Sequence, residues 1–250
     1  MEITILGSGT GVPDKERGSP GIAVRSDDTL LLMDLGSGTL YRAVRFGVDL
    51  NRVDAVLLSH LHPDHTGDLV PLLFAFLSPE WSRDEALTVF GPADLPEFFR
   101  HLEAAYGRWI AAKGYRLEIK VLQGGSASLK GVHLRTCPVR HGPRAVAYEV
   151  TDASMRRLVY SGDTGYSDDL AVFAKNADLL ILECSFPEGE EQPGHLTPSE
   201  AGRIAGKAGC RRLLLTHFFP SCRGQDLLTP CRRSYDGPIT LAEDGLVIAI

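Results

Sequence analysis

The segment Ser59-His60-Leu61-His62-Pro63-Asp64-His65 carries three imidazoles and one carboxylate within six residues, directly after a short apolar run. Neutral imidazole and carboxylate are ligands that suit Zn²⁺ and similar divalent ions. Alternate residues of an extended chain point the same way, so His60 and His62 can face one position. The chain turns at the proline, so Asp64 and His65 can face a second position nearby. One short loop can therefore supply two adjacent metal sites.

Further candidate ligands lie where predicted strands run into loops. Three residues, His141, Asp163 and His217, each come at or just after the end of such a strand. Loops held at strand ends by a rigid sheet are where sites are usually built. A carboxylate has two oxygens, so Asp163 can bridge two cations. The sequence therefore predicts two divalent cations, most simply zinc, and seven metal ligands: His60, His62, Asp64, His65, His141, Asp163 and His217.

Three of the eight histidines lie outside this set. His101 lies off the apolar stripe of its predicted helix, and His133 belongs to the polar face of a predicted strand. His195 lies two residues before Thr197, the predicted N-cap of a helix. Free N–H groups and the positive end of the helix dipole favour an anion there, so His195 could donate a proton to a leaving oxygen. On chemistry alone, a loop histidine without a role is an equal alternative.

Strands and helices alternate along the whole chain without an internal repeat or a linker, which favours a single domain over residues 1–250. A mixed two-sheet core with helices outside accounts for the pattern better than a purely parallel sheet. Hydrophobic periodicity and a capping box predict helices at Thr39–Phe46, Leu95–Lys113, Asp169–Lys175 and Pro198–Lys207. Strands are predicted at Ile3–Leu6, Ile22–Arg25, Leu30–Met33, Val53–Leu58, Leu117–Leu122, Val132–Val139, Ala145–Val150, Arg157–Tyr160, Leu179–Cys184, Leu213–Thr216 and Leu246–Ile250.

Composition excludes several classes of protein. The apolar content is too high for a disordered chain, and no run approaches the roughly 20 apolar residues of a membrane span. The first residues lack the features of a signal peptide, which favours a cytoplasmic protein. A net charge of −6 argues against a domain that mainly binds nucleic acid.

The five cysteines include no CxxC pair, which is consistent with a reducing compartment. Cys210, Cys222 and Cys231 could in principle share a structural metal. Their spacing matches no compact zinc module, so buried or free thiols are favoured.

The HxHxDH loop, the later histidine, the aspartate of Ser161-Gly162-Asp163-Thr164 and the final histidine resemble the metallo-β-lactamase superfamily. Within it, the segments Leu6–Arg17 and Leu32–Thr39 are similar to the ribonuclease Z branch, as is the His195–Thr197 element. The resemblance covers essentially the whole chain. It implies an α+β fold, an αββα sandwich of two mixed β-sheets flanked by helices, with a dinuclear zinc site between the sheets.

The resemblance also implies roles for the site residues. Asp64 would orient a metal-bridging hydroxide that acts as the nucleophile, and His195 would help the leaving group depart, so these two are the expected catalytic residues. The metal ligands would divide into two sets that share Asp163: His60, His62 and His141 on one zinc, and Asp64, His65 and His217 on the other.

One departure from the branch concerns its tRNA-binding arm, which is inserted between the equivalents of His141 and Asp163. Only 21 residues separate them here, and they are predicted to form two strands and a turn. We therefore expect a zinc-dependent phosphodiesterase without the arm, acting on a small phosphodiester or on RNA ends and needing no membrane. A lactone, thioester or sulfate-ester hydrolase of the same fold and a binding module without turnover are the alternatives, and a homodimer is left open.

Overall fold

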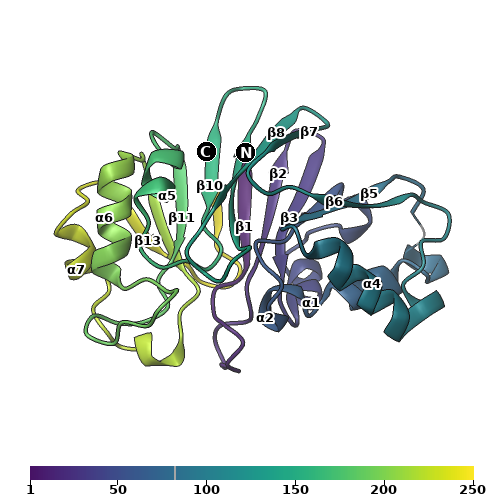
Figure 1. Cartoon of the computed structure of the whole chain (residues 1–250), viewed down its shortest axis with the longest axis horizontal. Helices are drawn as coiled ribbons and strands as arrows, with labels where there is room; N and C mark the ends of the chain where they lie inside the picture. Colours follow the sequence, from purple (N-terminus) through teal and green to yellow (C-terminus); the bar gives the residue numbers. More distant parts are fainter. Residues whose placement is uncertain (82) are drawn as a thin grey trace.

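The computed structural model describes residues 1–81 and 83–250, which form two seven-stranded β-sheets packed face to face (Figure 1). The first sheet contains β1 (Glu2–Gly7), β2 (Gly21–Ser26), β3 (Thr29–Leu35), β4 (Ala55–Leu57), β5 (Leu87–Gly91), β6 (Leu117–Val121) and β14 (Val247–Ala249). The second contains β7 (Ser126–Leu129), β8 (Val132–Pro138), β9 (Val146–Thr151), β10 (Arg157–Tyr160), β11 (Leu179–Glu183), β12 (Leu213–Thr216) and β13 (Ile239–Leu241).

Both sheets are mixed. The first has the order β14-β1-β2-β3-β4-β5-β6, antiparallel as far as β3 and parallel from β3 to β6. The second has the order β13-β12-β11-β10-β9-β8-β7, antiparallel from β7 to β10 and parallel from β10 to β13. The predicted two-sheet core is thus confirmed. The last strand, β14, returns to the first sheet and pairs with β1, so this sheet uses both ends of the chain.

Helices cover the outer faces of the two sheets. They are α1 (Thr39–Arg45), α2 (Pro63–Thr66), α3 (Leu69–Ala75), α4 (Leu95–Tyr106), α5 (Asp168–Phe173), α6 (Pro198–Ala208) and α7 (Leu228–Arg232). Short 3₁₀ turns occur at Leu50–Arg52, Pro79–Trp81, Gly107–Trp109 and Pro220–Cys222. In Figure 1, α1, α2 and α4 lie beside the first sheet, and α5, α6 and α7 beside the second. The order of layers is therefore helix, sheet, sheet, helix.

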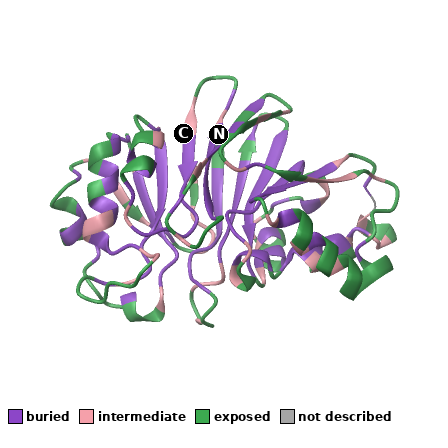
Figure 2. Cartoon of the chain, in the orientation of Figure 1, coloured by how far each residue is buried: buried purple, intermediate pink, exposed green. Residues whose placement is uncertain are grey.

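Two apolar layers hold this sandwich together. One lies between the sheets and continues under α5 and α6, with Ile3, Met33 and Tyr148 in its centre. The other lies between the first sheet and its helices, where Leu32 and Leu72 pack. Figure 2 shows the inner strands mostly buried, the edge strands partly exposed and the outward sides of the helices exposed, as expected when each element buries one apolar face.

Helix α6 begins and ends as its sequence predicts. The Thr197 and Glu200 side chains form the predicted capping box, and Pro198 occupies the first turn. The helix ends at Gly209, whose φ of 59° is the left-handed conformation common after a helix.

Some predicted boundaries were wrong. The helix predicted over Leu95–Lys113 ends at Tyr106, because Gly107 leaves the helical conformation with a φ of 50° and a 3₁₀ turn follows. The run Val53–Leu58 contributes only the three residues of β4. The sequence interpretation also missed β5, β7, β13, α2, α3 and α7, which are short elements stabilised mainly by their neighbours in the fold.

The segment between His141 and Asp163 consists of β9, a tight turn and β10, as predicted, and no arm projects from it. Over residues 1–81 and 83–250, no helix has the length and apolarity needed to cross a membrane.

Candidate metal centre

The structure brings all seven predicted ligands together at one edge of the sandwich. They lie in the segments that follow β4, β8, β10 and β12, with Asp64 and His65 in α2, so both sheets contribute. Two groups of side chains each place one ligand atom per residue within 4.8 Å of the others: His60, His62, His141 and Asp163 in one, and Asp64, His65 and His217 in the other. The division is the one that the family resemblance implies.

Asp163 faces both groups at once. Its Oδ2 lies 3.8 Å from Nε2 of His60 and 3.8 Å from Nε2 of His141. Its Oδ1 lies 3.3 Å from Nε2 of His65 and 3.3 Å from Nε2 of His217. One carboxylate therefore presents a different oxygen to each group, which is the arrangement needed to bridge two cations.

Some ligand atoms have no hydrogen-bond partner although they are buried. Among the described residues, Nε2 of His60 and Oδ1 of Asp163 are in this position. Buried polar atoms are ordinarily hydrogen-bonded, so unpaired ones that face other donor atoms need an explanation. In addition, Nε2 of His65 and Nε2 of His217 lie only 3.3 Å apart. The residues therefore fit divalent cations held between them.

The opposite ring nitrogen of most of these histidines already has a partner. A bond at Nδ1 fixes the ring and leaves Nε2 free for a metal ion, as is usual for metal-ligating histidines. The partners of Nδ1 are Ser59 Oγ for His60 at 3.0 Å, Asp34 Oδ2 for His65 at 2.8 Å, the Gly194 carbonyl for His141 at 2.9 Å and Ser185 Oγ for His217 at 2.9 Å.

The imidazoles and carboxylates of the cluster shift each other's pKa values. Burial and the positive charge of His65 lower the pKa of His60 to about 2, so this ring is neutral and able to bind a metal ion. Burial opposes ionisation of Asp163, but His217 and His65 outweigh it and hold the pKa of Asp163 well below its usual value. Burial also opposes protonation of His65, but Asp163 and Asp34 raise its pKa well above the usual value. The carboxylates thus require positive charge at the centre, which divalent cations would supply.

Asp34 organises the first sheet's side of the site. Its fully buried carboxylate accepts hydrogen bonds from the Ser59 N–H at 2.7 Å and the Tyr160 hydroxyl at 2.8 Å, and it contacts His65. Asp34 adopts a φ of 57°, a left-handed conformation that costs free energy and is often found at functional sites. The sequence analysis gave Asp34 no role, although a lone carboxylate within an apolar strand was a signal for one.

Gly162 allows Asp163 to reach its position. A β-carbon at residue 162 would lie 2.5 Å from Cβ of Ser59, and Gly162 has a φ of 57°. Only glycine accommodates both the left-handed conformation and this close approach. The loop after β10 can therefore press against the loop that carries the HxHxDH segment.

His195 lies beside the cluster and is held by a buried carboxylate that the sequence analysis missed. Its Nδ1 lies 2.9 Å from Oε1 of Glu183, and one of its ring nitrogens belongs to a group with Asp163 and His217. Glu183 also accepts hydrogen bonds from the N–H groups of Thr164 at 2.8 Å and of residue 196 at 3.1 Å. Burial lowers the pKa of His195, but the hydrogen bond and charge of Glu183 outweigh it and raise that pKa.

Asp64 lies at the mouth of a groove. Its Oδ2 accepts a hydrogen bond from the Gly11 N–H at 2.9 Å and lies 3.7 Å from Nε2 of His217. Burial opposes its ionisation, but the neighbouring imidazoles of His217 and His65 outweigh it and lower the pKa of Asp64. The groove has a volume of about 470 Å³ and is lined by residues of the 10–19 loop together with Ser37, Arg42, Pro63 and Asp64.

The remaining candidate residues stay outside the cluster. His101 and His133 are exposed, as predicted. Cys210, Cys222 and Cys231 are buried free thiols, and within residues 1–81 and 83–250 none of them joins a group of ligand residues.

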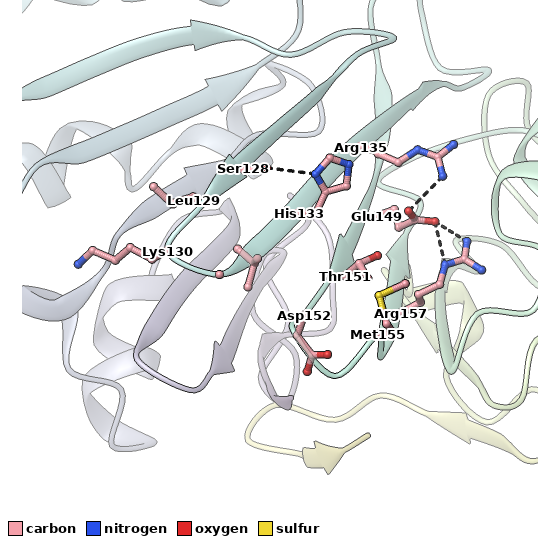
Figure 3. Close-up of a pocket in the computed structure, with 12 residues that line it drawn as sticks. Ser128, Leu129, Lys130, His133, Arg135, Glu149, Thr151, Asp152, Met155 and Arg157 are labelled. Atoms are coloured by element: carbon pink, nitrogen blue, oxygen red, sulfur yellow. Dashed lines mark hydrogen bonds and ion pairs between the residues drawn. The ribbon is translucent and has the colours of Figure 1, made fainter.

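A second hollow, of about 680 Å³, lies on the outer face of β7 to β10 (Figure 3). Glu149 pairs with Arg135 at 3.3 Å and with Arg157, so one carboxylate is shared by two guanidinium groups in this hollow. None of the seven predicted ligands lines this hollow. It is separate from the metal centre.

Comparison with known proteins agrees with this geometry. The sequence model of a family described as "Beta-lactamase superfamily domain" matches residues 33–218, from the end of β3 to the residue after His217. The chain belongs to the metallo-β-lactamase superfamily. It is 33% identical over 257 positions to "Probable metallo-hydrolase YhfI" of Bacillus subtilis (strain 168), with 99% of each chain covered. The superfamily predicted from the sequence is thereby confirmed.

Two further comparisons bear on the fold and the branch. The crystal structure of the metallo-β-lactamase fold protein YhfI from Bacillus subtilis superposes with a TM-score of 0.84 at 29% identity, covering 99% of this chain and 98% of that one. "Ribonuclease Z" of Myxococcus xanthus (strain DK1622) is 29% identical, with 100% of this chain and 98% of the relative covered. The αββα sandwich and the likeness to the ribonuclease Z branch are confirmed.

Proposed function

We propose that this chain is a zinc-dependent phosphodiesterase that hydrolyses small phosphodiesters, with RNA ends as a second substrate class. The observation that carries the proposal is the position of Asp163 between the two ligand groups, with the His195–Glu183 pair beside them. When bound, two divalent cations activate water at neutral pH and offset charge on the phosphoryl oxygens. The residues that would hold them are His60, His62, His141, Asp64, His65 and His217, with Asp163 shared.

Two side chains, Asp64 and His195, would assist the proton transfers of the reaction. Asp64 is ionised and lies at the mouth of the groove, so its carboxylate can accept a hydrogen bond from the attacking water and orient it. Glu183 raises the pKa of His195, which favours the protonated ring, and no side chain of residues 1–81 and 83–250 is hydrogen-bonded to Nε2 of this ring. As the P–O bond to the leaving alcohol breaks, His195 can transfer a proton to the departing oxygen.

The proton donor favours a phosphodiester over the alternative substrates. Two cations match the two non-bridging oxygens of a phosphodiester, whereas a neutral lactone or thioester offers one carbonyl oxygen. An alcohol leaving a phosphodiester is basic and gains from protonation, whereas a thiol leaves readily as a thiolate. The lactone, thioester or sulfate-ester hydrolase of the same fold remains the second candidate.

Several observations favour small substrates over precursor tRNA. The connection from His141 to Asp163 is a compact pair of strands, and the net charge of −6 opposes extensive phosphate contacts. The alignment with Ribonuclease Z of Myxococcus xanthus runs over 307 positions against 250 residues, so that relative carries segments that this chain lacks. The alignment with YhfI runs over only 257 positions.

A substrate panel on zinc-loaded protein tests the proposal. We expect bis(4-nitrophenyl) phosphate to be hydrolysed with a larger kcat/KM than a thioester or a lactone, and elemental analysis to find two zinc ions per chain. Faster hydrolysis of the thioester or lactone would favour the second candidate. Full zinc content without turnover of any substrate would favour a binding module.

A further inference from the structure

Two phenylalanines form an aromatic surface on the His195 side of the metal centre. Phe186 follows β11 and Phe219 follows β12, the two neighbouring parallel strands. Their rings are stacked, with centroids 4.6 Å apart and planes inclined by 20°. Both side chains are partly exposed, so a ligand can reach them.

This surface is held in a fixed position relative to His195. The His195 ring approaches Phe186 at 5.6 Å and Phe219 at 6.1 Å between centroids, at interplanar angles of 68° and 76°. The Phe219 N–H donates to the Ser185 carbonyl at 3.2 Å, and Glu183 fixes the imidazole from behind. The two phenylalanines therefore border the position at which an alcohol would leave.

The chain between Phe186 and His195 is acidic. Glu188, Glu190 and Glu191 are all exposed there, and no basic residue interrupts them. Negative charge beside the leaving-group side disfavours a second phosphate or another anionic substituent on that arm of the substrate. Arg17 and Arg223 also line a hollow beside Phe219, but Asp14 and Glu16 lie there with them, and Arg223 pairs with Asp14. The three glutamates therefore leave the surface with net negative charge, which favours an uncharged group.

We infer that Phe186 and Phe219 stack against an uncharged planar ring carried by the leaving alcohol of a single phosphodiester, such as the base of a nucleoside. The inference rests on the proposed phosphodiesterase function and specifies its substrate class. Aromatic faces bind planar rings by offset or edge-to-face packing, and this preference is largely independent of the ring's hydrogen-bonding pattern. The phenylalanines would therefore select for a ring without selecting strongly among bases.

The first test compares two diesters that differ only in the ring. Dibenzyl phosphate and bis(cyclohexylmethyl) phosphate have the same charge, similar size and similarly basic leaving alcohols, but only the benzyl ring is planar. We expect wild-type protein to prefer the dibenzyl ester in kcat/KM by about 5- to 100-fold, the range that stacking of a base on an aromatic side chain provides. The double variant Phe186→Leu/Phe219→Leu keeps apolar side chains. In this variant the ratio of kcat/KM for the two diesters should be close to one.

The control variant is Phe74→Leu on α3. Phe74 is exposed, and its ring centroid lies 5.9 Å from that of Trp109. Because Phe74 lies outside the metal centre, this variant should keep the wild-type preference for the dibenzyl ester. All variants should bind the same amount of zinc. A preference that is absent in the wild type, or unchanged in the double variant, would overturn this inference and leave the phosphodiesterase proposal standing. Failure of the wild type to hydrolyse either diester while it hydrolyses bis(4-nitrophenyl) phosphate would overturn this inference alone. Failure on all three diesters, with zinc bound, would overturn both.

The second test concerns charge. Bis(4-carboxybenzyl) phosphate keeps the planar ring and adds a carboxylate to it, so the wild type should hydrolyse it several-fold less efficiently than the dibenzyl ester at low salt. The variant Glu188→Gln/Glu190→Gln/Glu191→Gln should reduce that difference. Equal use of the charged and uncharged esters by the wild type would show that the acidic segment does not select against charge, which would overturn that part of the inference.

Discussion

Replacing His195 with alanine distinguishes three roles for this residue: proton donor, metal ligand and loop residue without a function. The imidazole is bonded to Glu183 through Nδ1, and the seven other residues complete both ligand groups without it. We therefore expect His195→Ala to retain two zinc ions per chain. We expect the rate of hydrolysis to fall by about 10²- to 10⁴-fold, the usual contribution of a positioned general acid.

The size of the loss should depend on the leaving group. A 4-nitrophenolate of low pKa departs without a proton, whereas a benzyl alkoxide needs one. The loss caused by His195→Ala should therefore be close to the upper limit for dibenzyl phosphate and much smaller for bis(4-nitrophenyl) phosphate. Steady-state kinetics on the two diesters, with zinc measured in the same samples, provides the comparison.

Glu183→Gln is the matched variant for the residue that positions His195. Glutamine keeps the size and an acceptor oxygen but removes the charge that raises the pKa of His195. In the proposed mechanism the protonated form of His195 is active, so activity should be lost as the pH rises through its pKa. Removing the charge of Glu183 lowers that pKa, so the alkaline limb of the profile should move to lower pH in Glu183→Gln.

Three results would refute this reasoning. Equal losses on the two diesters would remove the proton-donor role, and loss of zinc from His195→Ala would make His195 a ligand. Unchanged rates on both diesters would leave His195 as a loop residue near the site.

Four further predictions concern the site, the fold and the substrate. Asp163→Ala should lower zinc content and activity together, as measured by elemental analysis and kinetics, because one carboxylate serves both ligand groups. Gly162→Ala should reduce the free energy of unfolding by about 1–3 kcal/mol in a denaturant titration, because a β-carbon meets Ser59 and the φ is positive. Burial opposes ionisation of Asp152, but hydrogen bonds from Arg156 lower its pKa. The stability advantage of the wild type over Asp152→Asn should therefore be complete above about pH 5 and shrink as the pH falls below about 4, as measured by Tm against pH. Precursor tRNA should be cleaved much less efficiently at physiological salt than small phosphodiesters, which a gel assay beside the diester assay would check.

The sequence was most informative at the metal centre, where four of the ligand residues lie within one short segment. The HxHxDH loop and the residues after three strands were sufficient to predict seven side chains that meet within one site. Strand ends are predictable from apolar runs, and parallel strands bring their carboxyl ends to one edge of a sheet. His195 could be singled out because a capping box marked the helix that follows it.

The supporting residues could not be predicted in the same way. Asp34 contacts Tyr160 across 126 positions of the chain, and Glu183 contacts a histidine 12 positions later through a loop. Such contacts depend on the order of strands within each sheet, which local periodicity does not contain. The same limit explains why β13, with three residues, was missed. The end of α4 was misplaced for a local reason, because the prediction continued the helix past Gly107, where it ends.

The pairing of β14 with β1 has a consequence for the synthesis of this protein. The first strand leaves the ribosome early, but its outer neighbour consists of residues 247–249, and the Met1 amine donates to the Ile250 carbonyl at 2.9 Å. During translation the first sheet therefore keeps an open edge at β1 until residues 247–249 have emerged. An unpaired edge is a template for association with other chains, so a nascent chain of this protein should depend on chaperones, and truncations before residue 247 should aggregate rather than fold.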